Sequence, residues 1–64
     1  MNYTREQLIE ALMAEDELYR HDQQMPMSRE DYKDYLEGLT IEELVVETST
    51  SDAFTLDEFM SNWI

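Results

Sequence analysis

A repeated helix-start pattern is the feature of this chain that most constrains its fold. Residues 39–46 form its most apolar run, and within them Thr40 precedes Glu43 by three positions. That spacing is typical of a capping box, in which each residue's side chain bonds the other's backbone N–H. Leu39 and Leu44 stand at the spacing of a hydrophobic staple. The run is therefore predicted to begin a helix.

The same order of apolar, Ser/Thr, acidic or amide, and apolar residues occurs three more times. The three copies are Tyr3-Thr4…Gln7-Leu8, Met27-Ser28…Asp31-Tyr32 and Phe54-Thr55…Glu58-Phe59. Four such starts in 64 residues predict an all-α fold, a compact small bundle of three to four short helices. Residues 1–64 are expected to form a single helical domain.

The helix bounds follow from these starts and from the residues that end each apolar pattern. The expected helices run from Arg5 to Arg20 or His21, from Arg29 to Glu37, from Ile41 to about Glu47, and from Leu56 to the C-terminus. Gly38 is expected to end the second helix in a left-handed conformation. Because β-branched residues are frequent in residues 45–50, a short strand is the alternative there.

The apolar faces predict the core and leave a few positions open. The expected inward residues are Leu8, Ala11, Leu12, Leu18 and Tyr19, then Tyr32, Tyr35 and Leu36, then Ile41, Leu44 and Val45, and finally Leu56, Phe59, Met60, Trp63 and Ile64. Val46 lies off its helix's inward face, so it either meets a third layer or is exposed. Trp63 is expected to close the core, with a dimer interface as the alternative.

Two acidic residues fall on or beside the apolar face of the first helix. Glu15 projects into that face, which predicts a place at the rim of the core or a pair with a tyrosine hydroxyl or a base. A partner-contact role is the second interpretation. Asp16 stands four residues before Arg20, where an ion pair on one helix face is expected.

The charge balance indicates which partners the chain favours. Sixteen acidic residues face four basic ones, for a formal net charge of −12. Such a field repels nucleic acids and anionic membranes and attracts basic proteins, including nucleic-acid-binding proteins. No direct nucleic-acid binding and no membrane partner are therefore expected. The polar start and the lack of a long apolar run predict a cytoplasmic protein.

The sequence offers little for catalysis. It holds one His, one Gly and no Cys, so we expect neither an enzyme nor a cofactor. Glu17 and His21, at i and i+4, could sit on one helix face as two metal ligands, with a third ligand from Asp22 or from another chain. Such a pair arises easily by chance in so acidic a helix, and no metal site is predicted.

Two binding hypotheses account for the acidic surface. Carboxylates on a rigid helical scaffold could imitate nucleic-acid phosphates and occupy a basic groove, or an apolar patch could pack on a partner while charge keeps the chain in solution. Mimicry predicts association that collapses with added salt, whereas an adaptor predicts modest salt sensitivity. The candidate partner-binding residues are Glu15, Met25, Met27, Val46, Asp57 and Glu58.

Both ends of the chain resemble a group of phage proteins. The opening, residues 3–12 (YTREQLIEAL), and the close, residues 54–60 (FTLDEFM) with Trp63, are similar to small acidic proteins of tailed phages, above all those of cyanobacteria. The middle of the chain matches less clearly. The resemblance implies a small phage protein that acts on a host or phage partner in the host cytoplasm, and it carries over no catalytic or binding residue.

Together these features predict a helical protein, monomer or homodimer, that binds another protein and modulates it. Inhibition of a nucleic-acid-processing machine is the most specific form of this hypothesis. The alternative is a structural or assembly protein that self-associates through the face around Trp63.

Overall fold

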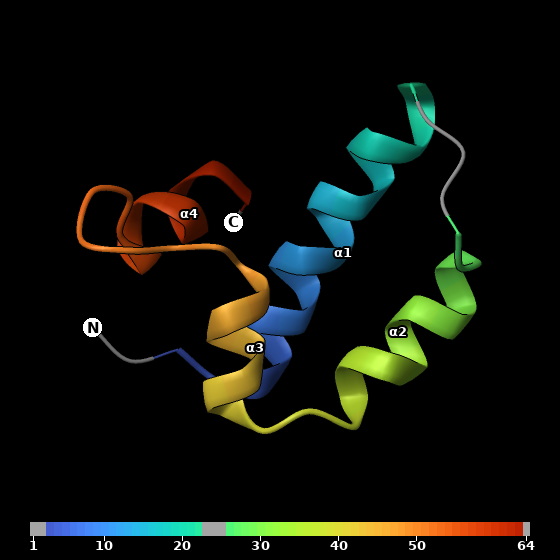
Figure 1. Cartoon of the computed structure of the whole chain (residues 1–64), viewed down its shortest axis with the longest axis horizontal. Helices are drawn as coiled ribbons and strands as arrows, with labels where there is room; N and C mark the ends of the chain where they lie inside the picture. Colours follow the sequence, from blue (N-terminus) through green and yellow to red (C-terminus); the bar gives the residue numbers. More distant parts are fainter. Residues whose placement is uncertain (1–2, 23–25, 64) are drawn as a thin grey trace.

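Helix α1 is the central element, and the other three helices each pack against it (Figure 1). This computed structural model describes residues 3–22 and 26–63, without the side chains of residues 21 and 22. The helices are α1 (Arg5–Asp22), α2 (Arg29–Glu37), α3 (Ile41–Glu47) and α4 (Leu56–Trp63). The predicted all-α small bundle is thus confirmed.

Reciprocal capping bonds fix the starts of α1 and α3. The Thr40 hydroxyl accepts from the backbone N–H of Glu43 at 3.2 Å, and the Glu43 carboxylate accepts from the N–H of Thr40 at 2.9 Å. The Gln7 N–H donates to the Thr4 hydroxyl at 3.1 Å, and the Gln7 side chain accepts from Thr4 N–H at 2.9 Å. Both predicted capping boxes are therefore present.

The other two helix starts are capped more weakly. The Ser28 hydroxyl accepts from the N–H of Asp31 at 3.1 Å, without a reciprocal bond from the short aspartate side chain. At the start of α4, Thr55 and Glu58 bond each other reciprocally, but at 3.3 and 3.4 Å. All four helices thus begin at the predicted residues.

The core is one cluster between α1 and its three partners. Its buried apolar members are Leu8, Ala11, Leu12, Met13, Leu36, Leu44, Phe59 and Met60. Trp63 is partly buried and packs against this cluster, with its ring centroid 6.4 Å from that of Phe59. Ile64, also expected to face inward, lies outside the described residues.

Four residues expected in the core are substantially exposed. Leu18 and Tyr19 show 53% and 48% of their surface, because α1 has 18 residues and outruns partners of seven to nine residues. Ile41 is 43% exposed because it occupies the first position of α3, which packs on α1 chiefly through the fully buried Leu44. Tyr35 of α2 is 44% exposed as well. The prediction of inward positions was wrong for all four.

The left-handed residue also lies elsewhere than predicted. Gly38 has φ −84°, so it ends α2 in a right-handed conformation. Ser49, just after the last turn of α3, has φ 60° instead. Val46 is 76% exposed, so it faces solvent and does not meet a third layer. Residues 45–47 are helical, and the chain as described contains no strand, so the strand alternative was wrong.

Candidate partner-binding face

The arginines are all engaged within the fold. Arg5 donates to the backbone carbonyls of Glu37 and Leu39, Arg20 to that of Met27 at 2.6 Å, and Arg29 to that of Met13 at 3.1 Å. Each bond joins segments that are distant or separated by a loop. These guanidinium groups are thus structural, and they offset less of the acidic surface than free side chains would.

Two of these arginines also hold a buried carboxylate. Asp16 is only 4% exposed; its Oδ2 lies 2.6 Å from Arg20 Nε and 3.8 Å from Arg29 Nη1. The predicted pair with Arg20 is therefore confirmed. Asp16 Oδ1 is buried and has no hydrogen-bond partner among the described residues. Because this carboxylate is enclosed, we assign it to the packing of α1 against the chain around Met27.

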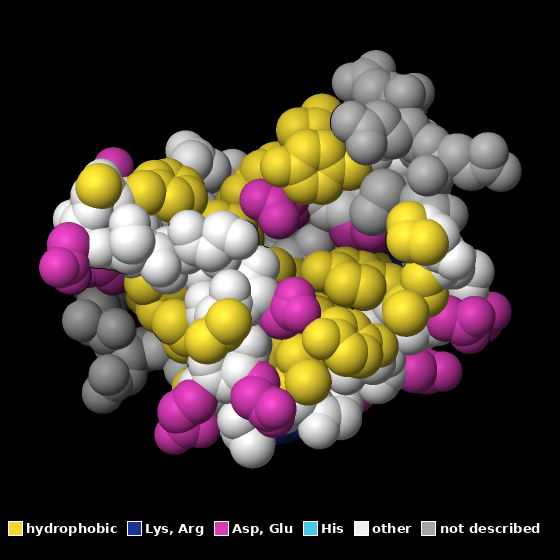
Figure 2. All heavy atoms as spheres, in the orientation of Figure 1, with side chains coloured by type: hydrophobic (Ala, Val, Ile, Leu, Met, Phe, Trp, Pro, Cys, Tyr) yellow, Lys and Arg dark blue, Asp and Glu magenta, His cyan; other side chains and the backbone are white. Residues whose placement is uncertain are grey.

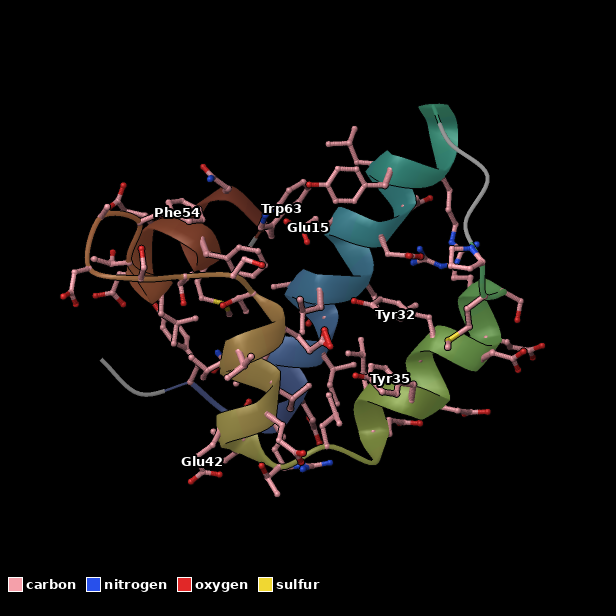
Figure 3. All side chains as sticks on the ribbon, viewed as in Figure 1. Glu15, Tyr32, Tyr35, Glu42, Phe54 and Trp63 are labelled. Atoms are coloured by element: carbon pink, nitrogen blue, oxygen red, sulfur yellow. The ribbon has the colours of Figure 1, made fainter. Side chains whose placement is uncertain are left out.

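Aromatic rings and carboxylates gather on the face of the molecule that Figures 2 and 3 show. Figure 3 shows Glu15 of α1 between Trp63 of α4 and Tyr32 of α2, with Tyr35 beside Tyr32. In Figure 2, apolar and acidic side chains alternate across this face. The Tyr32 and Tyr35 rings stack with centroids 6.3 Å apart. We define the aromatic–acidic face by Glu15, Tyr32, Tyr35 and Glu47.

Hydrogen bonding and charge tie the members of this face together. The Tyr35 hydroxyl donates to Glu47 Oε1 at 2.9 Å, which links α2 to α3. That bond, together with the charge of Glu47, raises the pKa of Tyr35. Burial, and then the nearby charges of Glu47, Asp16 and Glu15, raise the pKa of Tyr32 to about 12. The phenols are therefore neutral donors at pH 7, surrounded by negative charge.

Glu15 is the member of the aromatic–acidic face whose charge is least compensated. It is partly buried, and burial raises the pKa of its carboxyl. No described side chain forms a hydrogen bond or an ion pair with it. Glu15 therefore lies at the rim of the core, as one interpretation predicted, without the tyrosine or basic partner that the other required. Its carboxylate is a partly desolvated acceptor with no donor among the described side chains.

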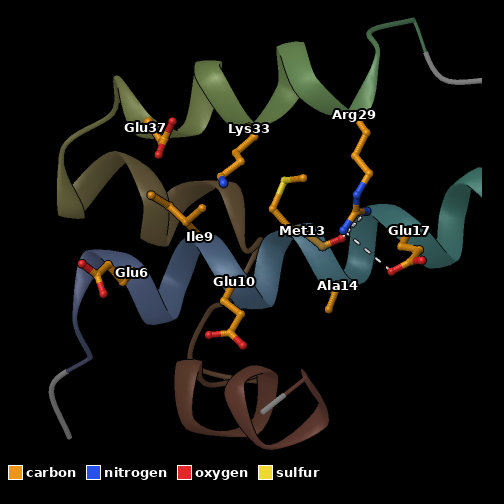
Figure 4. A pocket seen from close by; sticks show the side chains of 9 residues that line it. All are labelled: Glu6, Ile9, Glu10, Met13, Ala14, Glu17, Arg29, Lys33 and Glu37. Atoms are coloured by element: carbon orange, nitrogen blue, oxygen red, sulfur yellow. Dashed lines mark hydrogen bonds and ion pairs between the residues drawn. The ribbon is translucent and has the colours of Figure 1, made fainter.

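A groove lies between α1 and α2, apart from the aromatic–acidic face (Figure 4). It is an open groove of about 670 Å³ with Ile9, Met13 and Ala14 among its lining residues. Arg29 and Lys33 reach into it from α2, and Arg29 contacts Glu17 at 3.7 Å. Cations stand among the carboxylates of this groove, whereas neither Glu15 nor Glu47 is paired with a cation among the described residues.

The predicted partner-binding residues do not gather at one place. Glu15 belongs to the aromatic–acidic face, and Val46 is an exposed residue of α3 next to Glu47. Met27 is 39% exposed, but its carbonyl is held by Arg20. Met25 lies outside the described residues.

The two acidic candidates at the start of α4 have structural contacts. Asp57 Oδ1 accepts a hydrogen bond of 2.7 Å from the Tyr3 hydroxyl, and this bond is the main reason that the pKa of Tyr3 is raised. Glu58 bonds Thr55 in the helix cap. Both carboxylates are exposed, but neither adjoins Glu15 in sequence or shares a bond with the aromatic–acidic face.

Three members of the aromatic–acidic face were absent from the predicted site residues. Tyr32 and Tyr35 are spaced i, i+3 on α2, a signal that was interpreted as core packing. Only Leu36 of that helix face is fully buried, whereas Tyr32 is partly buried and Tyr35 is 44% exposed. Glu47 had no distinguishing signal, since its role depends on how α3 is placed beside α2.

Neither a membrane span nor a metal cluster is found in residues 3–22 and 26–63. None of the helices there combines the length and apolar character that a bilayer crossing requires. No three or more His, Cys, Asp or Glu side chains are placed to hold a metal ion among those described. The side chains of His21, one of the two paired ligands, and of Asp22, the third ligand, lie outside that set.

Comparison with protein-family models, with curated proteins and with solved structures gives no match. The resemblance of the two ends of the chain to small acidic phage proteins stays a prediction.

Proposed function

We propose that this chain is a binding module for a basic protein and that it modulates this partner by covering its basic surface. Where the partner binds nucleic acid, the chain competes as a charge mimic of the phosphate backbone. The observation that carries the proposal is the engagement of Arg5, Arg20 and Arg29 by carbonyls within the fold. The acidic side chains around them are mostly exposed, so the outer field is strongly negative.

The aromatic–acidic face supplies the specific part of the proposed contact. Exposed Tyr35 and the partly exposed Tyr32 offer large rigid rings of the kind enriched in protein interfaces. Glu15 and Glu47 stand beside them with acceptor capacity left over. Rings among carboxylates suit a basic surface better than a neutral apolar one, because an apolar partner would desolvate both carboxylates without compensation.

Self-association through the Trp63 face is the alternative function. Trp63 packs against the chain's own core, although Leu18 and Tyr19 are exposed at the end of α1. Pairing two chains that each carry −12 requires apolar contact that outweighs their mutual repulsion. A basic partner meets no such repulsion and is therefore favoured.

Affinity capture at two salt concentrations tests the proposal. The immobilised chain should retain basic proteins from a cell lysate at about 0.1 M salt and release them near 1 M, where the Debye length falls from about 10 Å to about 3 Å. A retained nucleic-acid-binding protein should then, once purified, lose its nucleic acid when the chain is added. Capture of neutral or acidic proteins that resists salt would contradict the proposal, and so would concentration-dependent dimerisation without any such capture.

A further inference from the structure

The aromatic–acidic face brings two carboxylates close to a pair of phenol rings. Glu15 approaches Tyr32 from α1, and Glu47 approaches it through its bond to Tyr35. The two carboxylates come from different helices, but both lie close enough to Tyr32 for their charges to act on its phenol. The face thus presents two negative charges around a pair of stacked rings, and none of the arginines bonds to either carboxylate.

The free acceptor atoms indicate what the site lacks. Glu47 uses Oε1 for the Tyr35 hydroxyl, and no donor among the described residues engages its other carboxylate oxygen. Glu15 is partly buried and accepts from no described donor. A partly desolvated carboxylate without a donor is unfavourable unless a cation with several N–H groups completes it.

We propose that an arginine side chain of a basic partner occupies this site, its guanidinium against the rings of Tyr32 and Tyr35 and its N–H groups donating to Glu15 and Glu47. This inference rests on the proposed function and names the chemistry by which the same face recognises its partner.

The stacked rings are the reason to choose arginine over lysine. A guanidinium is planar, weakly hydrated and able to stack on an aromatic face while it donates to carboxylates in its own plane. A lysine ammonium is compact and strongly hydrated, so it loses more solvation in such a position and offers no planar fork. Diffuse attraction by the net charge of −12 would not distinguish the two cations.

Two peptides of equal charge test the inference on the intact chain. Octa-arginine amide and octa-lysine amide are titrated at low salt, with binding followed by calorimetry and by the fluorescence of Trp63, the chain's single tryptophan. We expect the arginine peptide to bind about tenfold more tightly, the effect of one additional charge-assisted hydrogen-bonded contact.

Matched variants separate the site from the general field. E15Q keeps the side-chain shape and should reduce the affinity for octa-arginine about tenfold, to the level of octa-lysine. E10Q removes the same charge from an exposed position of α1 that lines the other groove, and should change the affinity less than about twofold. E47Q is a second variant, on α3, and is expected to act like E15Q. Circular dichroism verifies that each variant is helical.

The outcomes distinguish the two proposals. Equal affinities for both peptides, with E15Q and E10Q indistinguishable, would overturn the arginine site and leave the general attraction of basic partners intact. If neither peptide binds at low salt, both proposals are wrong. An arginine preference that E15Q and E47Q abolish and E10Q preserves would establish the site.

Discussion

Asp16 and Arg20 lie one turn apart on α1 and form an ion pair of 2.6 Å in which the carboxylate is almost fully buried. Arg20 also donates to the Met27 carbonyl, so one guanidinium joins α1 to the chain that leads into α2. Arg29 Nη1 lies 3.8 Å from the same carboxylate oxygen, Asp16 Oδ2. The fold therefore depends on a buried charge whose main counter-charge is a single, partly exposed arginine.

Removing Arg20 alone should lower the free energy of unfolding more than removing Asp16 and Arg20 together. We expect R20A to lower the free energy of unfolding by about 2–4 kcal/mol, because the Asp16 carboxylate stays buried with only the distant Arg29. The double variant D16A/R20A should recover part of this loss, since no buried charge is left. Urea titrations measure both. K33A, at an exposed cation, is the control and should stay within about 0.5 kcal/mol. A double variant no more stable than R20A would show that the unpaired Asp16 charge is not the cause of the loss.

The capping box at Thr40 makes a second stability prediction. T40A should lower the free energy of unfolding by about 0.5–2 kcal/mol, because the Glu43 N–H loses its acceptor at the start of α3. T55A is the comparison, with a smaller expected loss, since its bonds to Glu58 are 3.3 and 3.4 Å long. A T40A protein with an unchanged denaturation midpoint would mean that this cap does not stabilise α3.

The fold was predictable to the extent that local interactions determine it. Helix starts depend on residues three positions apart, so the caps at Thr4, Ser28, Thr40 and Thr55 could be recognised from sequence. The exposure of Leu18 and Tyr19 could not, because it depends on how far α1 extends past its neighbours. Gly38 shows the same limit: a glycine permits a left-handed conformation but does not require it.

The candidate site was less predictable than the fold. Glu15 could be identified because a carboxylate interrupts an apolar helix face. Its neighbours Tyr32, Tyr35 and Glu47 come from α2 and α3, and only the packing of those helices on α1 brings them to one face. Tyrosine at i, i+3 spacing indicates a face but not whether that face is covered. Sequence thus located one residue of the site and missed those joined to it by tertiary structure.

The two aromatic residues of α4 should differ in their contribution to stability. Phe59 is 1% exposed, and F59A should cost about 3–5 kcal/mol because it leaves a cavity in the core. Trp63 is only partly buried, so W63A should cost less, about 1–3 kcal/mol. Denaturant unfolding at two protein concentrations measures both. Equal losses would contradict the partial burial of Trp63, and a midpoint that rises with concentration would favour self-association.

Alkaline titration should reveal the enclosed phenol of Tyr32. Its pKa is about 12 in the fold and about 10 in an unfolded chain, so its contribution to stability is complete below pH 10 and is lost as the pH rises towards 12. Tyrosinate absorbance should contain a late component that disappears in Y32F. Between these pH values Y32F should lose less stability than the parent chain. A Y32F titration curve with the late component still present would assign it to another tyrosine.

Glu15 should show the stability cost of the proposed arginine site. Burial raises the pKa of its carboxyl in the fold, so the stability that it contributes is complete below its ordinary pKa of 4.5 and is lost as the pH rises through the folded-state value. At pH 7 the ionised group therefore opposes folding, and E15Q should stabilise the chain by less than about 1 kcal/mol, because solvent still reaches the carboxylate. The advantage of E15Q should shrink below pH 4.5, where both side chains are neutral. E10Q, at an exposed position, should show no such advantage.

A variant that gains stability and loses arginine affinity would indicate a carboxylate maintained for binding at the expense of folding. If E15Q instead destabilises the chain at pH 7, Glu15 must have a stabilising partner within the fold.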